Sequence, residues 1–98
     1  MLTGFIKEAL EENADSLEFE YAVGKLLVMG FQRHEGFGIG SVESNSEDCE
    51  RIVDEIAALK KKGRVKIAGT TWLVYVSEYE AFGATAWRLQ FFPTTKAR

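Results

Sequence analysis

Cysteine and histidine are almost missing from this sequence, which contains one of each, Cys49 and His34. A lone cysteine forms no internal disulfide, and one cysteine with one histidine cannot build a metal cluster. Because free thiols are typical of a reducing compartment, we expect a cytoplasmic protein. We also expect that it binds no metal and no other cofactor.

Long hydrophobic runs and proline are also scarce. The longest apolar stretch, residues 26–31, is far shorter than the roughly 20 residues of a membrane-spanning helix. The first residues lack a basic segment followed by an apolar core, so we expect no signal peptide and no membrane contact. Pro93 is the only proline, and nothing before it resembles a proline-rich linker. We expect one domain over residues 1–98 with a polar, frayed tail at 94–98.

Basic side chains are scarce in the first half of the chain, and acidic side chains are scarce in the second half. Residues 1–55 carry thirteen acidic and four basic side chains, whereas residues 56–98 carry two acidic and eight basic ones. Such an asymmetry indicates either a charged partner or two halves of the fold that face each other.

Two segments have the periodicity of amphipathic helices. Apolar residues recur at helical spacing over residues 2–10 and again over residues 46–59. Acidic side chains crowd the first turn of the second segment, where they complement the helix dipole. Ser44, Asn45 and Ser46 are cap-type residues, Ser44 and Glu47 have the spacing of a capping box, and we expect the helix to begin at about Ser46.

The remaining segments read as strands. Apolar residues alternate with Glu18 and Glu20 in the first of them, so we expect both glutamates to face water. Gly24-Lys25 then suits a type II′ hairpin turn. The strands at 26–31 and 72–76 are apolar on both faces. We therefore expect one sheet face to lie under the helices. The other face would be covered either by the sheet curling around itself or by a second copy, in a homodimer.

The predicted fold class is α+β. The element order αβββαβββ divides the chain into two units, residues 1–44 and 45–93, which form a mostly antiparallel sheet with two helices packed on it. An offset of 45 residues aligns four identical residues in the two units. This match is consistent with an internal repeat.

Glycine occupies alternate positions in one stretch, at Gly36, Gly38 and Gly40. A dinucleotide-binding loop needs G-x-G-x-x-G directly before a helix, and Ser41 stands where the third glycine would be. We therefore predict a strand with one bare face, because glycine in a strand often marks a close approach. Trp72, Trp87 or a partner chain would cover that bare face.

The candidate catalytic residues lack partners. His34 falls in a predicted turn, and Cys49 lies on the apolar stripe of the second helix, where a buried thiol is the ordinary role. Thiol catalysis needs a base beside the cysteine. Without a nucleophile, a base and a group that orients them, we expect no enzyme. A pocket for a small ligand between helices and sheet is one alternative.

Charged side chains supply two candidate binding sites. The candidate protein-binding residues are acidic: Glu11, Glu12, Asp15, Glu18 and Glu20. The candidate nucleic-acid-binding residues are basic: Lys60, Lys61, Lys62, Arg64 and Lys66. Basic clusters bind phosphate backbones, but the isoelectric point of about 5.2 ranks nucleic acid below protein as a partner. If the first and fourth strands were neighbours, Arg64 and Lys66 would pair with Glu18 and Glu20.

The function predicted from these observations is a non-catalytic protein–protein interaction module, such as an adaptor, an inhibitor or an immunity-type protein. Nucleic-acid contact through Lys60–Lys66 and small-ligand binding are the alternatives.

Overall fold

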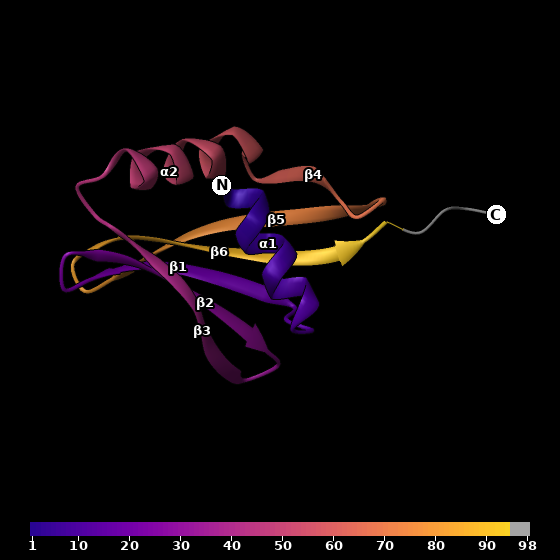
Figure 1. The fold of residues 1–98 in the computed structure, drawn as a ribbon, viewed down its shortest axis with the longest axis horizontal. Coiled ribbons are helices and arrows are strands. Elements are labelled where there is room, and N and C mark those ends of the chain that lie inside the picture. Colours follow the sequence, from indigo (N-terminus) through magenta and orange to yellow (C-terminus); the bar gives the residue numbers. More distant parts are fainter. Residues whose placement is uncertain (95–98) are drawn as a thin grey trace.

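The chain folds into one antiparallel sheet of six strands with two helices packed against it (Figure 1). The computed structural model describes residues 1–94. In chain order the elements are α1 (Leu2–Glu11), β1 (Ser16–Ala22), β2 (Lys25–Gln32), β3 (Glu35–Glu43), α2 (Glu47–Leu59), β4 (Lys62–Ile67), β5 (Thr70–Ala81) and β6 (Ala84–Pro93). The α+β class and the order αβββαβββ are confirmed, whereas common ancestry of the two units stays a prediction.

The strands lie in the order β3-β2-β1-β6-β5-β4, so each unit contributes a three-stranded meander. The two meanders join where β1 pairs with β6, and Glu18 of the acidic half lies opposite Arg88 of the basic half. β4 is the outer strand of the second meander. The predicted pairing of Arg64 and Lys66 with Glu18 and Glu20 is therefore wrong, because β6 and β5 separate β4 from β1.

Both helices cover the same face of the sheet. Phe5 of α1 contacts Phe19 of β1 edge to face, with ring centres 6.4 Å apart. Cys49 of α2 lies 3.7 Å from the hydroxyl of Tyr21, which shares a sheet face with Phe19 because side chains two apart point the same way. The core fills the space between this face and the helices. Its largest fully buried side chains are Ile6, Leu17, Phe19, Leu26, Val28, Ile52, Ile56, Val74 and Leu89.

The other side of the sheet, which we call the uncovered face, carries no helix from residues 1–94. The strand register places the side chains of Leu27, Met29 and Phe31 there, because each lies opposite a residue of β1 or β3 that points away from the core. Tyr75 and Phe92 also point to this face, and each is 41% exposed. The predicted apolar character of both sheet faces is confirmed, whereas the homodimer stays a prediction.

The start of α2 differs from the predicted capping box. The N-cap is Ser46, whose Oγ accepts a hydrogen bond from the backbone N–H of Cys49 at 3.1 Å. Ser44 lies two residues too early to cap, so its spacing to Glu47 has no role in starting the helix. The predicted start of the helix at about Ser46 is therefore confirmed, whereas the capping-box spacing of Ser44 and Glu47 is not used.

Three hairpins turn on a residue followed by glycine, and both turn residues have positive φ. They are Val23-Gly24, Ala68-Gly69 and Phe82-Gly83. Positive φ at both central residues is the signature of a type I′ turn, whose twist matches that of the strands. The predicted type II′ turn at Gly24-Lys25 is therefore wrong, because the turn begins one residue earlier and Lys25 already pairs in β2.

Val23 is a costly residue for its position. Its φ is 54°, and a left-handed conformation costs an L-residue about 1–2 kcal/mol. Its side chain is 98% exposed, so it recovers almost nothing by burial. We expect Val23→Asn to stabilise the protein by about 1 kcal/mol in urea unfolding, because asparagine tolerates this conformation. Val23→Ala is the control: it keeps the strain, so an equal gain in this variant would contradict the explanation.

The glycine-rich strand β3 contains a register shift that divides its glycines between the two faces. The shift lies opposite Val28/Met29 of β2. A Cβ at Gly36 would lie 2.6 Å from the ring of Phe31 on the uncovered face, and one at Gly40 would lie 3.1 Å from Phe5 of α1. The predicted close approach is confirmed at Gly36 and Gly40, where the neighbours are phenylalanines and not the predicted Trp72 and Trp87. It is wrong at Gly38, where a Cβ would meet nothing within 4 Å, and the predicted single bare face is wrong because of the register shift.

The predicted polar tail is partly described. Thr94 does not fray: its N–H and its Oγ1 both donate to the carbonyl oxygen of Thr71, at 3.1 and 2.8 Å. The rest of the tail, 95–98, lies outside the described residues.

Candidate functional site

The five candidate acidic residues do not form one surface. Glu11 and Glu12 are at the end of α1, where Glu11 pairs with Lys7 at 3.6 Å. Asp15 bridges two turns, since its Oδ2 accepts a hydrogen bond from the backbone N–H of Arg33 at 3.0 Å. Glu18 and Glu20 lie instead in the middle of the uncovered face.

Glu18 and Glu20 are held by a polar cluster that joins the two meanders. The hydroxyl of Tyr79 on β5 donates to Glu20 at 2.5 Å and to Glu18 at 3.1 Å. Arg88 on β6 binds Glu18 Oε2 through Nε and Nη2, both at 2.8 Å. Burial and the two carboxylates raise the pKa of Tyr79 far above the ordinary value for tyrosine. These two glutamates therefore fasten the sheet together and are already partnered.

The basic cluster is divided between two places. Lys62 and Arg64 lie on β4 opposite Tyr75 and Leu73, so they and Lys66 point to the uncovered face. The ammonium group of Lys62 lies 5.8 Å from the ring centre of Tyr75. Tyr75 also contacts Phe92 edge to face at 5.3 Å. This part of the uncovered face thus combines cations with exposed aromatic rings.

The histidine and the cysteine occupy unrelated positions. His34 is exposed in the turn between β2 and β3, whereas Cys49 is 2% exposed beneath α2, as its place on the apolar stripe predicts. The thiol of Cys49 lies beside the hydroxyl of Tyr21. The pKa of Tyr21 is raised to about 12, mainly because its hydroxyl is buried and also because of this contact with Cys49. Within residues 1–94 no three His, Cys, Asp or Glu side chains gather where they would hold a metal ion.

A groove lies between α2 and the second half of β5, and it begins where β4 begins. β4 pairs with β5 only from Thr70 to Tyr75, while β5 continues to Ala81. Lys60 has φ 59°, which turns the chain out of α2 and into the line of β4. α2 lies beside the stretch of β5 that β4 leaves unpaired, and the groove separates the two (Figure 1).

The groove is apolar inside and basic at one end. It encloses about 700 Å³, within the 300–1,000 Å³ of typical ligand sites. Val53, Ile56 and Ala57 of α2 form one wall, and Val76 and Trp87 of the sheet form the floor. Its rim residues are Lys60, Lys61, Ser77 and Glu78. Lys60 and Lys61 thus lie on the groove, away from the other three residues of the predicted basic cluster.

The floor of the groove has a free strand edge. The backbone N–H of Val76 donates to the carbonyl oxygen of Lys61 at 3.0 Å, which is the last hydrogen bond on this side of β5. Backbone N–H and C=O groups of successive strand residues point to opposite edges, so those of Glu78 and Glu80 point to the same edge of β5 as those of Val76. Among the described residues no backbone group pairs with them there. Unpaired groups of this kind are a template for another strand.

Sequence reasoning missed this groove. The predicted pocket between helices and sheet has no specified lining residues. The sequence pattern predicts phosphate binding for the lysines at the end of α2. The signal that was available is a difference in length, because the segment 70–81 is twice as long as 62–67. A strand that outlasts its partner must leave part of its edge free.

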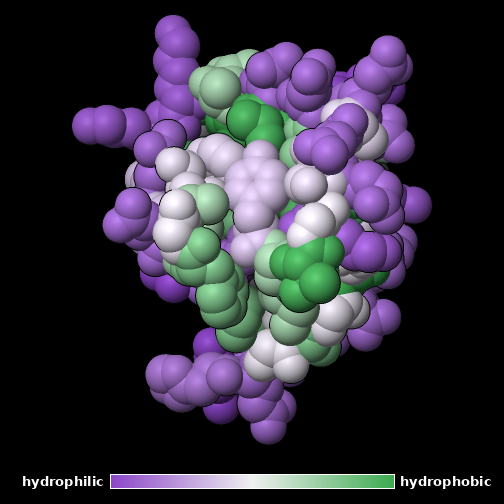
Figure 2. Space-filling view, turned by 90° about the vertical axis from the view of Figure 1, so that its left-hand side faces the viewer, coloured by the Kyte–Doolittle hydropathy of each residue, from purple (hydrophilic) through white to green (hydrophobic). Residues whose placement is uncertain are grey.

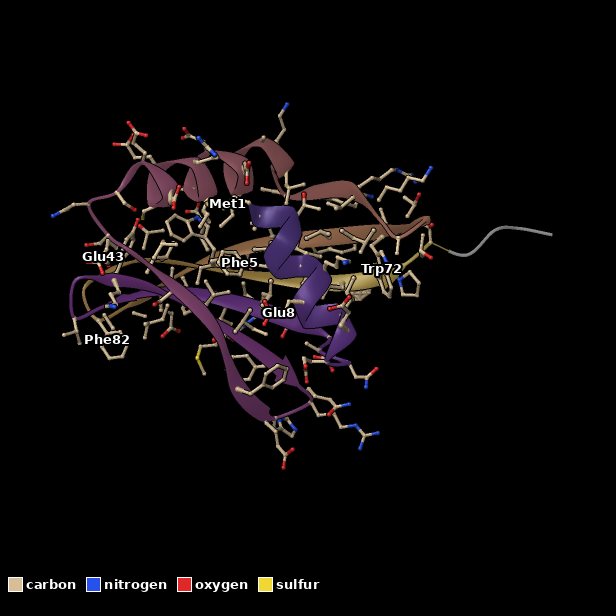
Figure 3. The ribbon with its side chains drawn as sticks, viewed as in Figure 1. Met1, Phe5, Glu8, Glu43, Trp72 and Phe82 are labelled. Carbon is tan, nitrogen blue, oxygen red and sulfur yellow. The ribbon has the colours of Figure 1, made fainter. Side chains whose placement is uncertain are left out.

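A second exposed apolar feature lies at the hairpin end of the molecule. Val23 and Phe82 border the same shallow hollow, and Phe82 is 79% exposed. Figure 3 shows Phe82 at the end opposite Trp72. Figure 2 looks onto that end and shows apolar side chains gathered there inside a hydrophilic surround.

Comparison with known proteins gives no family. No protein-family model matches the chain, and no curated protein resembles it in sequence. In the part of the chain that the structure describes, neither helix has the length and apolar character to span a membrane.

Proposed function

We propose that this protein is a non-catalytic protein-binding module that takes up an extended segment of a partner in the groove between α2 and β5. The observation that carries the proposal is the free edge of β5 at Glu78 and Glu80, directly beside an apolar cavity of about 700 Å³. Strand addition uses both features, since main-chain hydrogen bonds supply affinity and a pocket for alternate side chains supplies specificity.

The groove has room for a short peptide. The free stretch Ser77–Ala81 advances about 3.3 Å per residue, or roughly 17 Å in all, which about five residues of an added strand would cover. The free edge of β4 is less suited to strand addition than that of β5. Lys62, Arg64 and Lys66 lie along it, and charged side chains disfavour pairing at a sheet edge.

Selection from two libraries of displayed random heptapeptides tests the proposal, one library presenting free carboxyl termini and the other presenting the peptides inside a carrier protein. We expect enrichment of binders by the native protein and at least tenfold weaker binding by Ala57→Trp, whose indole would fill the groove. Ala58→Trp is the matched control, because Ala58 is also exposed on α2 but lines a different surface. Failure to enrich any sequence, or equal binding by both variants, would overturn the proposal.

Single-stranded nucleic acid is the second candidate, on a different surface. Tyr75 and Phe92 are exposed on the uncovered face beside Lys62, Arg64 and Lys66. Proteins that bind single strands combine stacked aromatic rings with cations, and each stacked base contributes about 1–3 kcal/mol.

We expect a labelled 12-nucleotide RNA to bind at 20 mM salt and to bind much more weakly at 200 mM. Tyr75→Ala should weaken the complex about tenfold or more, because one stacking platform is lost. Fluorescence anisotropy measures both effects. Phe82→Ala, which removes an exposed ring at the hairpin end, should leave binding unchanged. Absence of binding at low salt would dismiss this candidate.

A further inference from the structure

We infer that the groove recognises the free carboxyl terminus of its partner, with an aliphatic last residue and a basic residue two positions before it. This inference rests on the proposed function, because it specifies which kind of extended segment enters the groove. It follows from the direction of β4, the two lysines and the charges along α2.

The charge of Lys60 and Lys61 sets the direction of the added strand. A segment that continues the line of β4 backwards from Lys61 pairs with Ser77–Ala81, because Lys61 already lies opposite Val76. We place it antiparallel to β5, as β4 is, because this direction brings its negative carboxylate to Lys60 and Lys61, whereas the parallel direction would bring a positive ammonium group there. Its last residue is then the one nearest Lys61. A chain with further residues would meet Lys60 and Lys61, where the protein's own backbone already occupies the line. The groove therefore accepts a chain end, and the end it meets there is a carboxylate.

Two ammonium groups stand at that end of the groove. Lys60 and Lys61 both line it, and both side chains are exposed. No ion pair within residues 1–94 occupies either of them. They offset the partial negative charge of the carbonyl groups at the end of α2, which alone would disfavour an anion. Glu78 is the acidic side chain at this end of the groove, and one carboxylate against two ammonium groups leaves the end positive.

The register assigns the side chains of the added strand. Lys61 lies opposite Val76, so a last residue opposite Glu78 points its side chain to the helix side of the sheet, as Glu78 itself does. That side chain enters the cavity between Ala57, Ile56 and Trp87, where leucine, isoleucine or valine fits the apolar lining.

The residue two positions earlier meets acidic groups. It lies opposite Glu80 and points to the same side, toward the N-terminal half of α2. Glu50 and Asp54 line the adjoining hollow, which shares Val53 with the groove. The groove is thus basic at one end, and the hollow that adjoins its other end is acidic. A lysine or arginine two positions before a free carboxylate matches this polarity.

Two peptides of one sequence test the inference. Ala-Ala-Arg-Ala-Leu with a free carboxylate should bind at least tenfold more tightly than the same peptide with an amidated end. Titrations followed by nitrogen–proton correlation spectra measure both affinities. The shifted amide signals should include those of Glu78 and Glu80, whose N–H groups acquire acceptors.

Lys60→Gln and Lys61→Gln together should reduce the tenfold preference to less than twofold. These changes lie on exposed side chains and keep the backbone carbonyl of Lys61 that binds Val76. The matched control is Lys62→Gln with Lys66→Gln, which removes equal charge from the uncovered face and should preserve the preference.

The outcomes separate the two proposals. Equal affinity for the acid and the amide, with library binders still blocked by Ala57→Trp, would overturn the terminus inference and leave the protein-binding proposal standing. A preference unchanged in the Lys60/Lys61 double variant would also overturn the inference. Equal enrichment from both libraries would do the same, whereas no binders from either library would overturn both.

Discussion

Phe19→Ala is expected to lower the free energy of unfolding by about 3–5 kcal/mol, the usual cost of removing a fully buried phenylalanine. Phe19 is 0% exposed and lies at the join of the meanders, with Trp87 of β6 opposite it on one side and Val28 of β2 on the other. Phe5 of α1 contacts it edge to face. The change therefore opens a cavity between both meanders and a helix. Since domains are stable by about 5–15 kcal/mol, much of the total is at risk.

Urea unfolding followed by circular dichroism measures this loss as a lower midpoint. Phe82→Ala removes the same ring from a side chain that is 79% exposed, so it should change stability by no more than about 0.5 kcal/mol. If both variants unfolded at the midpoint of the native protein, the core would not be centred on Phe19. If Phe19→Ala were unfolded in buffer, Phe19→Leu would give a measurable midpoint below the native one.

Tyr79→Phe is expected to destabilise the protein by about 1–3 kcal/mol, because it leaves two half-buried carboxylates without their shared donor. The native hydroxyl donates to Glu20 at 2.5 Å and to Glu18 at 3.1 Å. Arg88 still binds Glu18 in the variant, but Glu20 has no other hydrogen bond from a side chain among residues 1–94. Denaturant unfolding at pH 7 measures the change. Tyr75→Phe, whose hydroxyl has no such role, is the control.

The same residue predicts a decline in stability at high pH. The pKa of Tyr79 is raised in the folded protein, so the folded state keeps a proton that the unfolded state releases above about pH 10. The folded state then binds more protons, and stability falls as pH rises through that range. Tyr21, whose pKa is raised to about 12, contributes in the same direction. Tyr79→Phe should show a shallower decline between pH 9 and 11, and an unchanged slope would contradict the assignment.

Much of the fold could be predicted from residue periodicity. The alternation of apolar residues with Glu18 and Glu20 reports a strand with one buried face, and the stripe around Cys49 reports an amphipathic helix. These patterns are local, so they identify elements without saying which strands become neighbours. The pairing of β1 with β6 joins segments about seventy residues apart. Charge alone suggested Arg64 and Lys66 as partners, whereas the sheet uses Arg88.

The candidate groove could not be predicted in the same way. Its floor depends on how far β5 extends beyond the end of β4, and its wall depends on the direction that the chain takes at the turn at Lys60. Composition indicates that Lys60 and Lys61 are cations, but only the three-dimensional arrangement places them at the end of an apolar cavity. The glycine stretch shows the same limit, because a register shift of one residue reverses which face each glycine occupies.

The narrow join between the meanders has a consequence for how fast the protein folds. Each meander closes through two-residue turns, whereas β1 and β6 share only four residue pairs and must enclose nearly the whole chain to meet. Closing so long a loop is entropically costly, and few contacts compensate until the pair is formed. Substitutions at this seam should therefore slow refolding.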